Sequence, residues 1–419
     1  MVLRAVNIIL LFACLIAGAR GQDTLRIALK DADAMLMARN LDLVAQHFEI
    51  DKAEAARIQA RLFNNPQVST EWSVRPERGS FFDVGPNGQK QLAIEELFRI
   101  AGQRGLGIRE AVARRKMTEA QYAEFVAALR LRTHSDLYRQ FYLSRALVAV
   151  NSQLDLLKGV ADAYGGQYDK GNVSLKEATR LRTSYFDLND QRVGLEKELN
   201  AVQAELRTLL VDDRTIVVQP SASELQLVRP LPADTSLLVR TALTNRGAVV
   251  AAQAELEAAE LDLKLQRRSN VPDLSLGALY DQNGSYLPNY TAITAGFSLP
   301  ILDRGQGRIR LAQAVQDQSR TQLAATQRVI RQQVLQANAD LSLLQQQYTS
   351  TSTGFEEQLD QLSESLIGNY LKSNISLLEF TDLFESYTSA IIRVNTLKAD
   401  LQNAYEQLEF AAGTKLFDR

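Results

Sequence analysis

The sequence predicts a mainly α-helical fold with a small β component, in which two long helical hairpins and two β-hairpins arise from an internal duplication. The phrase YDKGNVSL at residues 168–175 recurs as YLKSNISL at residues 370–377, an offset of 202 residues. Each copy lies between two long stretches in which apolar residues recur every three or four positions, so each is expected to form the tip of a helical hairpin.

The composition agrees with long helices and excludes several classes of function. Of 419 residues, 46% are hydrophobic and 23% are charged, and only nine are proline. Basic residues are scattered, which argues against nucleic-acid binding. No nucleophile, base and orienting group occur together, so we expect no enzyme activity and no cofactor. The only two histidines, His47 and His134, lie without metal-ligand spacing around them, so we expect ordinary surface or packing roles and no metal site.

The first 21 residues have the pattern of a secretory signal peptide. Arg4 precedes an apolar core at 5–17, and Ala19 and Gly21 are the small residues expected before a cleavage site. The single cysteine, Cys14, lies in that core, so it is either removed with the signal or serves as a lipidation site. No later run of about 18 apolar residues occurs, so we expect no transmembrane helix, and any bilayer crossing would be made by strands.

Residues 22–214 are predicted to form the first structural repeat. Helical spacing at 25–63, interrupted at Asn40, indicates one helix or two stacked helices, and Pro66 ends it. Apolar and polar residues then alternate, with Val68 and Trp72 on one face, which predicts a β-hairpin at 66–101. A helical hairpin follows at 108–212, and its first helix of some 60 residues would be about 90 Å long.

The second repeat is predicted at residues 235–419, after a proline-containing linker or equatorial segment at 215–234. It contains the same parts in the same order: a helix, a β-hairpin at 272–300 and a helical hairpin at 309–412, whose first helix is expected to run without interruption to about Tyr370. Asn40 aligns with Asn245 at an offset of 205 residues. The small changes in offset fall at loops, as expected after a gene duplication.

The two predicted tips share one turn chemistry. The first is Gly171-Asn172-Val173 and the second is Ser373-Asn374-Ile375. Glycine and asparagine tolerate the left-handed conformation that ends a helix. Ser174 and Ser376 are placed to cap the returning helices, with Glu177 and Glu379 three residues later as the acidic partners of a capping box.

The four predicted strands of one subunit are too few to close a barrel. Their length suits tilted strands in a bilayer, where an open sheet edge costs several kcal/mol for each unpaired backbone group. Closure would therefore need several subunits. An exported oligomer with a shared barrel and long helices on one side is the form expected of a conduit between the outer membrane and the periplasm.

Besides the duplicated tip phrase, the chain contains five short segments in a characteristic order and spacing: ARNLDL at 38–43, ARLFNNP at 60–66, GQR at 102–104, DRG at 303–305 and LEFAAG at 408–413. On these segments the chain resembles the TolC-like outer membrane efflux proteins over essentially all of its mature length, and it looks most like the outer membrane components of heavy-metal efflux systems. Two departures are Leu41, where that family usually has proline, and Ser373, which replaces the tip glycine.

The resemblance implies a homotrimer in the outer membrane that extends into the periplasm, with a twelve-stranded barrel and an α-helical tunnel. It implies a passive exit duct for substrates, metal cations among them. The partners would be outer membrane lipid, a periplasmic adaptor (membrane fusion) protein and an inner membrane efflux pump of the RND type. By position, Gly171, Asn172, Val173, Ser373, Asn374 and Ile375 would dock the adaptor, and Glu379 and Asp382 would form the pore gate.

Two interpretations of the acidic pair remain open. Glu379 and Asp382 are three residues apart, so they share a helix face, and threefold symmetry would make them a ring of carboxylates that favours cations. Alternatively, Glu379 caps a helix and Asp382 is a solvated charge, because acids are common at helix starts. In the first copy the equivalent residues are Glu177 and Arg180, and Arg180 is in a position to pair with the acids.

An alternative function is a periplasmic or surface coiled-coil scaffold or adaptor without a membrane barrel. The faces of the strands distinguish the two functions. A set of apolar strand residues would face lipid in a channel and a protein core in a scaffold: Val68, Trp72, Val74, Leu274, Leu276 and Tyr280.

Overall fold

The computed structural model describes residues 24–74, 81, 85, 88–284, 287–352, 355–372 and 374–417. The predicted signal peptide at 1–21, with Cys14, and the tip residue Ser373 lie outside the described residues. The chain divides into two compact units. The first contains the described parts of Met1–Val44, Phe125–Arg246 and Ile330–Arg419, and the second those of Ala45–Glu124 and Gly247–Val329.

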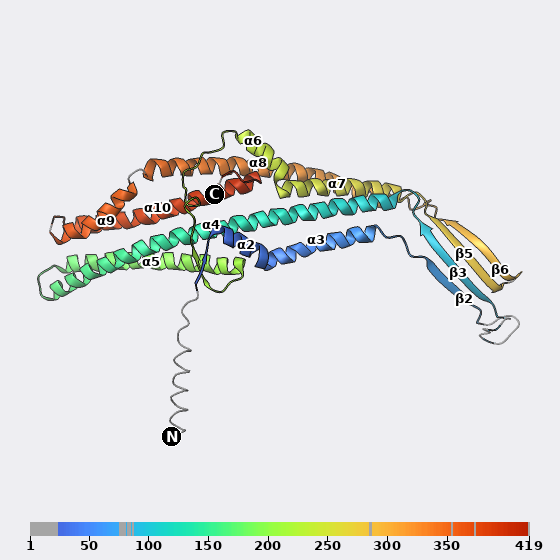
Figure 1. The fold of residues 1–419 in the computed structure, drawn as a ribbon, viewed down its shortest axis with the longest axis horizontal. Helices are drawn as coiled ribbons and strands as arrows, with labels where there is room; N and C mark the ends of the chain where they lie inside the picture. Colours follow the sequence, from blue (N-terminus) through green and yellow to red (C-terminus); the bar gives the residue numbers. More distant parts are fainter. Residues whose placement is uncertain are drawn as a thin grey trace, which may run out of the picture. The chain divides into compact units, whose positions relative to one another are not determined.

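The first unit is built mainly from helices (Figure 1). None of the described helices has an apolar stretch long enough to cross a membrane. The elements of this unit are β1 (Thr24–Ile27), α2 (Leu29–Arg39), α5 (Leu175–Leu210), β4 (Thr215–Val218), α6 (Thr235–Asn245), α9 (Phe355–Leu371) and α10 (Leu377–Ala412), together with parts of α3 (Leu41–Ala60), α4 (Gln103–Asp169) and α8 (Gln306–Ser352).

Two short strands in this unit correct the sequence prediction. Residues 24–27 were expected to begin a helix and residues 215–218 to be linker, but they pair as parallel strands with Thr24 opposite Thr215 and Ile27 opposite Val218. The pairing buries Ile216 completely. Strands of four residues are too short to show alternation, and their partner lies far away in the sequence, so periodicity alone does not reveal them.

The helix predicted from 309 to about Tyr370 is described as α8, which ends at Ser352, and α9, which begins at Phe355. The two residues between them lie outside the described part of the chain, so the predicted continuity stays a prediction. The long helices begin earlier than expected. α4 starts at Gln103, whose Oε1 accepts from the backbone N of Ala101 at 3.0 Å.

Asn40 separates α2 from α3, so the first stretch is two helices. Its backbone leaves the helical region, with φ −62° and ψ 121°. The Asn40 side chain satisfies backbone groups on both sides: Nδ2 donates to the carbonyl of Leu209 at 2.9 Å, and Oδ1 accepts from the N–H of Leu43 at 3.0 Å. Leu209 is in the last turn of α5, where carbonyls have no partner within the helix.

Arg246 has the equivalent position between α6 and α7, which corrects the alignment of Asn40 with Asn245 by one residue. Its φ of −63° and ψ of 125° repeat those of Asn40. Its Nη1 donates to the carbonyls of Phe410 at 3.0 Å and Ala411 at 3.4 Å, in the last turn of α10. Each return helix therefore ends against a side chain from the helix break of its own repeat, which supports an internal duplication.

The second unit contains a four-stranded antiparallel sheet in the order β2-β3-β5-β6 (Figure 1). Val68, Ile94, Ala278 and Ile293 lie opposite one another across the four strands. The strands are β2 (Gln67–Trp72), β3 (Lys90–Phe98), β5 (Leu274–Asn283) and β6 (Pro288–Phe297), and the unit also contains α7 (Gly247–Arg268) with the remaining parts of α3, α4 and α8.

One face of this sheet is apolar and the other is polar. The register places Thr70, Leu92 and Tyr280 on the face of Val68, and it places Gln67, Glu95 and Thr294 on the other face. The apolar face is exposed in a single chain, with Val68 64% and Ile293 88% accessible. A contiguous apolar surface of this kind normally marks a contact with a membrane or with another protein.

We expect the substitution Asn40→Ala to lower the free energy of unfolding by about 1–3 kcal/mol, because it leaves a buried carbonyl and a helix start without their partner. Asn245→Ala is the matched control, since Asn245 is exposed and should change stability by less than about 0.5 kcal/mol. Denaturation of the full chain measures both. Equal, small effects would show that the Asn40 contacts do not stabilise the helix junction.

Candidate functional site

The first helical tip is a tight turn built around a glycine. Gly171 has φ +77°, which a residue with a Cβ adopts only under strain. Its N–H donates to the carbonyl of Tyr168 at 2.8 Å, and the N–H of Asn172 donates to the carbonyl of Gln167 at 2.9 Å. These two bonds close the C-terminus of α4, and Asn172 is left exposed with Val173 half-buried beside it.

The second tip repeats this geometry at the residues that the structure describes. The N–H of Asn374 donates to the carbonyl of Asn369 at 2.9 Å. Its side-chain Nδ2 donates to Oδ1 of the same residue at 3.2 Å, as Nδ2 of Asn172 donates to Oε1 of Gln167 at 2.6 Å. Asn374 is exposed and Ile375 is half-buried. Each tip therefore presents an asparagine next to an accessible aliphatic side chain.

Both return helices begin with the predicted capping box. The backbone N and the hydroxyl of Ser376 each donate to Oε2 of Glu379 at 2.8 Å, and the N–H of Glu379 donates back to Ser376 Oγ at 3.2 Å. Ser174 and Glu177 make the same contacts. The backbone N–H and the hydroxyl of Ser376 hold the pKa of the exposed Glu379 carboxyl below its ordinary value.

The structure thus shows that Glu379 caps α10, while its role in a gate stays a prediction. Asp382 lies one turn further along the same helix and is exposed. Arg180, which takes the place of Asp382 in the first copy, donates from Nε to Thr381 Oγ1 at 3.0 Å. This bond joins the starts of α5 and α10, so the two tips lie side by side.

A ladder of aromatic rings lies behind the tips and was missed from the sequence. Tyr164 stacks on Tyr370 with ring centroids 6.1 Å apart, and Tyr370 stacks on Phe380 at 4.5 Å. Phe384 continues the ladder, 5.7 Å from Phe380. Burial raises the pKa of the Tyr370 hydroxyl, which therefore stays protonated. The tyrosine that opens both copies of the tip phrase was the one hint of this ladder in the sequence. The rings that stack on Tyr370 belong to other helices, so the phrase alone does not identify them.

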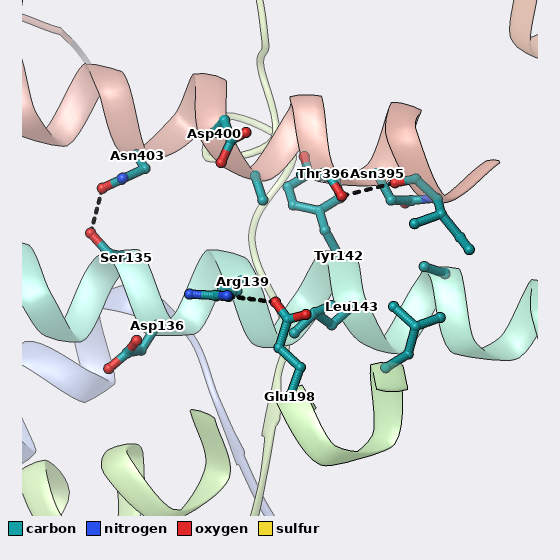
Figure 2. Close-up of a pocket in the computed structure, with 14 residues that line it drawn as sticks. Ser135, Asp136, Arg139, Tyr142, Leu143, Glu198, Asn395, Thr396, Asp400 and Asn403 are labelled. Carbon is teal, nitrogen blue, oxygen red and sulfur yellow. Dashed lines mark hydrogen bonds and ion pairs between the residues drawn. The ribbon is translucent and has the colours of Figure 1, made fainter. Parts of the chain in front are cut away.

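A polar pocket of about 230 Å³ lies among α4, α5 and α10 (Figure 2). Arg139 donates from Nε to Glu198 Oε1 at 2.8 Å across it, and Ser135 Oγ donates to Asn403 Oδ1 at 2.5 Å. Burial raises the pKa of Asp136 and of Asp400. These residues have no common motif, so the pocket was invisible in the sequence. Its polar contacts connect α4 to α5 and α10.

The histidines differ in their surroundings. His47, on α3 in the second unit, is exposed and packs edge-on against Tyr122 with ring centroids 5.7 Å apart. His134, on α4 in the first unit, is buried. Within the part of the chain that is described, no group of three or more His, Cys, Asp or Glu side chains is arranged to hold a metal ion.

Comparison with known proteins gives consistent matches. Residues 238–414 match the profile of the family described as outer membrane efflux protein. The cobalt-zinc-cadmium resistance protein CzcC of Cupriavidus metallidurans is 24% identical over 321 residues, which cover 76% of this chain and 73% of that protein.

Solved structures share the fold. CusC, studied for conformational changes during folding and transmembrane channel formation, superposes with a TM-score of 0.74 at 18% identity over 92% of both chains. The CmeC outer membrane channel of Campylobacter jejuni superposes with a TM-score of 0.76 at 14% identity, covering 92% of this chain and 85% of that one. The arrangement of helices and strands is therefore TolC-like.

Acid should loosen the start of α10. Because the folded-state pKa of Glu379 is lowered, its capping contribution is present above the ordinary value of 4.5 and is lost as pH falls through the lowered pKa. We expect amide hydrogen exchange at 376–380, corrected for intrinsic rates, to accelerate in acid, and Glu379→Gln to flatten this pH dependence.

The first copy supplies the matched control for this measurement. Glu177→Gln should flatten the acid response at 174–178 and leave the second tip unchanged, because each box is local to its own helix. An acid response that persists at 376–380 in Glu379→Gln would show that another group controls the opening of this turn.

Proposed function

We propose that the chain is the passive exit duct of a tripartite efflux system, a role supported by its match to the outer membrane efflux protein family over residues 238–414. The duct lies in the outer membrane and extends into the periplasm. It receives substrate from a periplasmic adaptor and an inner membrane pump of the RND type. The observation that carries this proposal is the exposed, one-sided apolar sheet with four strands in each subunit.

The sheet supports assembly into a homotrimer. β2 and β6 form its two edges, and within the described residues each pairs with one other strand only. In a bilayer, unpaired backbone groups along these edges would cost several kcal/mol each. Three copies placed edge to edge would form a closed barrel of twelve strands. This barrel would pair the backbone groups of both edges and turn the apolar faces toward lipid.

The same strands argue against a coiled-coil scaffold. In a scaffold, a protein core would cover the apolar face, whereas Val68, Trp72, Val74, Leu276 and Tyr280 are all exposed and only Leu274 is half-buried. Lipid is the occupant that matches the apolar chemistry of this face, and closure of the barrel would pair the open edges.

The helical tips are the proposed docking surface for the adaptor. Each offers an exposed asparagine and a half-buried aliphatic residue on a turn whose backbone is fixed by hydrogen bonds. Fixed turns lose little conformational entropy on binding, which favours recognition by a partner. The docking residues would be Gly171, Asn172 and Val173 in the first tip and Ser373, Asn374 and Ile375 in the second, with Ser373 lying outside the described residues.

The acidic pair just behind the second tip supports cation passage. Glu379 and Asp382 are both exposed, and in a trimer they would repeat three times around the tunnel. Rings of carboxylates favour cations over anions. The cobalt-zinc-cadmium resistance relative points to divalent metal ions as substrates. We propose metal cations as the cargo and Glu379 with Asp382 as the gate.

Channel recordings test the duct and the gate together. In planar bilayers the purified wild-type protein should conduct ions and prefer cations. Glu379→Gln with Asp382→Asn should move the ratio of cation to anion permeability toward one and raise the conductance, because the ring of charge is removed. Glu177→Gln alters the equivalent cap at the start of α5 and leaves Glu379 and Asp382 in place, so it should keep wild-type selectivity.

The possible results separate the two proposals. A wild-type protein that forms no channel contradicts the duct. A conducting protein whose selectivity is the same in the double variant and the wild type leaves the duct intact and contradicts the gate.

A further inference from the structure

A buried cluster of charges lies in the first unit, apart from the tips and the sheet. His134, on α4, is only 6% accessible. Its Nε2 lies 3.0 Å from Oδ1 of Asp33 on α2, and its Nδ1 lies 3.1 Å from Oε1 of Glu406 on α10. Arg130, one turn earlier on α4, places Nε 3.1 Å from the same oxygen of Asp33. One imidazole ring thus contacts two other helices.

This geometry selects the doubly protonated ring. A neutral imidazole has one N–H, so one of its nitrogens would turn a lone pair toward a carboxylate oxygen at hydrogen-bond distance. An imidazolium instead places a charged N–H against each carboxylate, with Nε2 hydrogen-bonded to Asp33 and Nδ1 ion-paired with Glu406. The charged groups that face the ring are Asp33 from α2, Glu406 from α10 and, through Asp33, Arg130 from α4 itself. With His134 protonated, two cations balance two anions.

We propose that His134 is a proton-dependent clamp that holds α2 and α10 on opposite nitrogens of a single ring, and that loss of one proton at alkaline pH releases one of the two helices. The clamp joins the two halves of the duplication. Asp33 and His134 come from the first copy, and Glu406 comes from the second.

The duplication itself shows that the clamp is specific to this junction. When the starts of equivalent helices are aligned, Val239 takes the place of Asp33, Ala337 that of His134 and Ala204 that of Glu406. All three are small or apolar and cannot form ion pairs, so the equivalent positions of the duplication cannot repeat this cluster of charges.

The electrostatics agree with the geometry. Burial alone would lower the pKa of His134, but its contacts with the Asp33 and Glu406 carboxylates outweigh burial and raise the pKa from 6.5 to about 9. The same contacts hold the pKa of Asp33 below its ordinary value despite burial. Because the pKa of His134 is raised on folding, the stabilisation is complete below pH 6.5 and is lost as pH rises through about 9.

Thermal unfolding of the full chain in detergent, measured from pH 6 to pH 10, tests the clamp. We expect His134→Gln and Glu406→Gln each to lower Tm by a few degrees at pH 7, and the double variant to lower it by less than the sum of the two, because they remove one shared contact. The Tm difference between wild type and His134→Gln should shrink above pH 9.

The second histidine provides the control. His47→Gln should give a Tm profile parallel to wild type across the pH range, because His47 is exposed. A pH-independent effect of His134→Gln, or strictly additive effects of His134→Gln and Glu406→Gln, would overturn the clamp and leave His134 as a packing residue.

A titration of the histidine rings by NMR does not depend on any variant at position 134 folding. The chain contains two histidines, so the His47→Gln protein has one, and its ring signal belongs to His134. We expect a doubly protonated ring at pH 7 with a midpoint above pH 8. A neutral tautomer at pH 7, or a midpoint at or below 6.5, would contradict the proposal.

Discussion

The open edges of the four-stranded sheet restrict how this protein can exist in a bilayer. A strand at a sheet edge presents unpaired N–H and C=O groups, and one face of this sheet exposes a row of apolar side chains that includes Val68 and Ile293. Closing both edges and covering that face are two demands that a trimer in a bilayer meets together. The amphipathic sheet therefore supports the proposed trimer in the outer membrane.

Helix termini impose a second constraint, and the chain meets it twice in the same way. The carbonyls in the last turns of α5 and α10 are bound by the side chains of Asn40 and Arg246, each at a break between two helices. The return helices then end in left-handed residues, Val211 at φ 51° and Gly413 at φ 67°. Because an asparagine serves this purpose in one copy and an arginine in the other, alignment by residue type matched Asn40 with Asn245 and missed Arg246.

The features that the sequence predicted well are local ones. Alternation identified the strands and their apolar face, and the spacing of Ser376 and Glu379 identified a capping box, because each depends on neighbours within a few residues. The features that it missed join distant segments. The pairing of β1 with β4, the aromatic ladder at Tyr370 and the ion pairs of His134 depend on which helices pack together, and no local pattern records this.

The mass of the protein extracted by detergent from outer membranes is the decisive test of the trimeric barrel. We expect a particle of three chains that requires detergent for extraction, because three sheets must close to remove their edges. A protein released without detergent, or a detergent particle of one or two chains, would contradict the barrel and with it the assignment of the apolar sheet face to lipid.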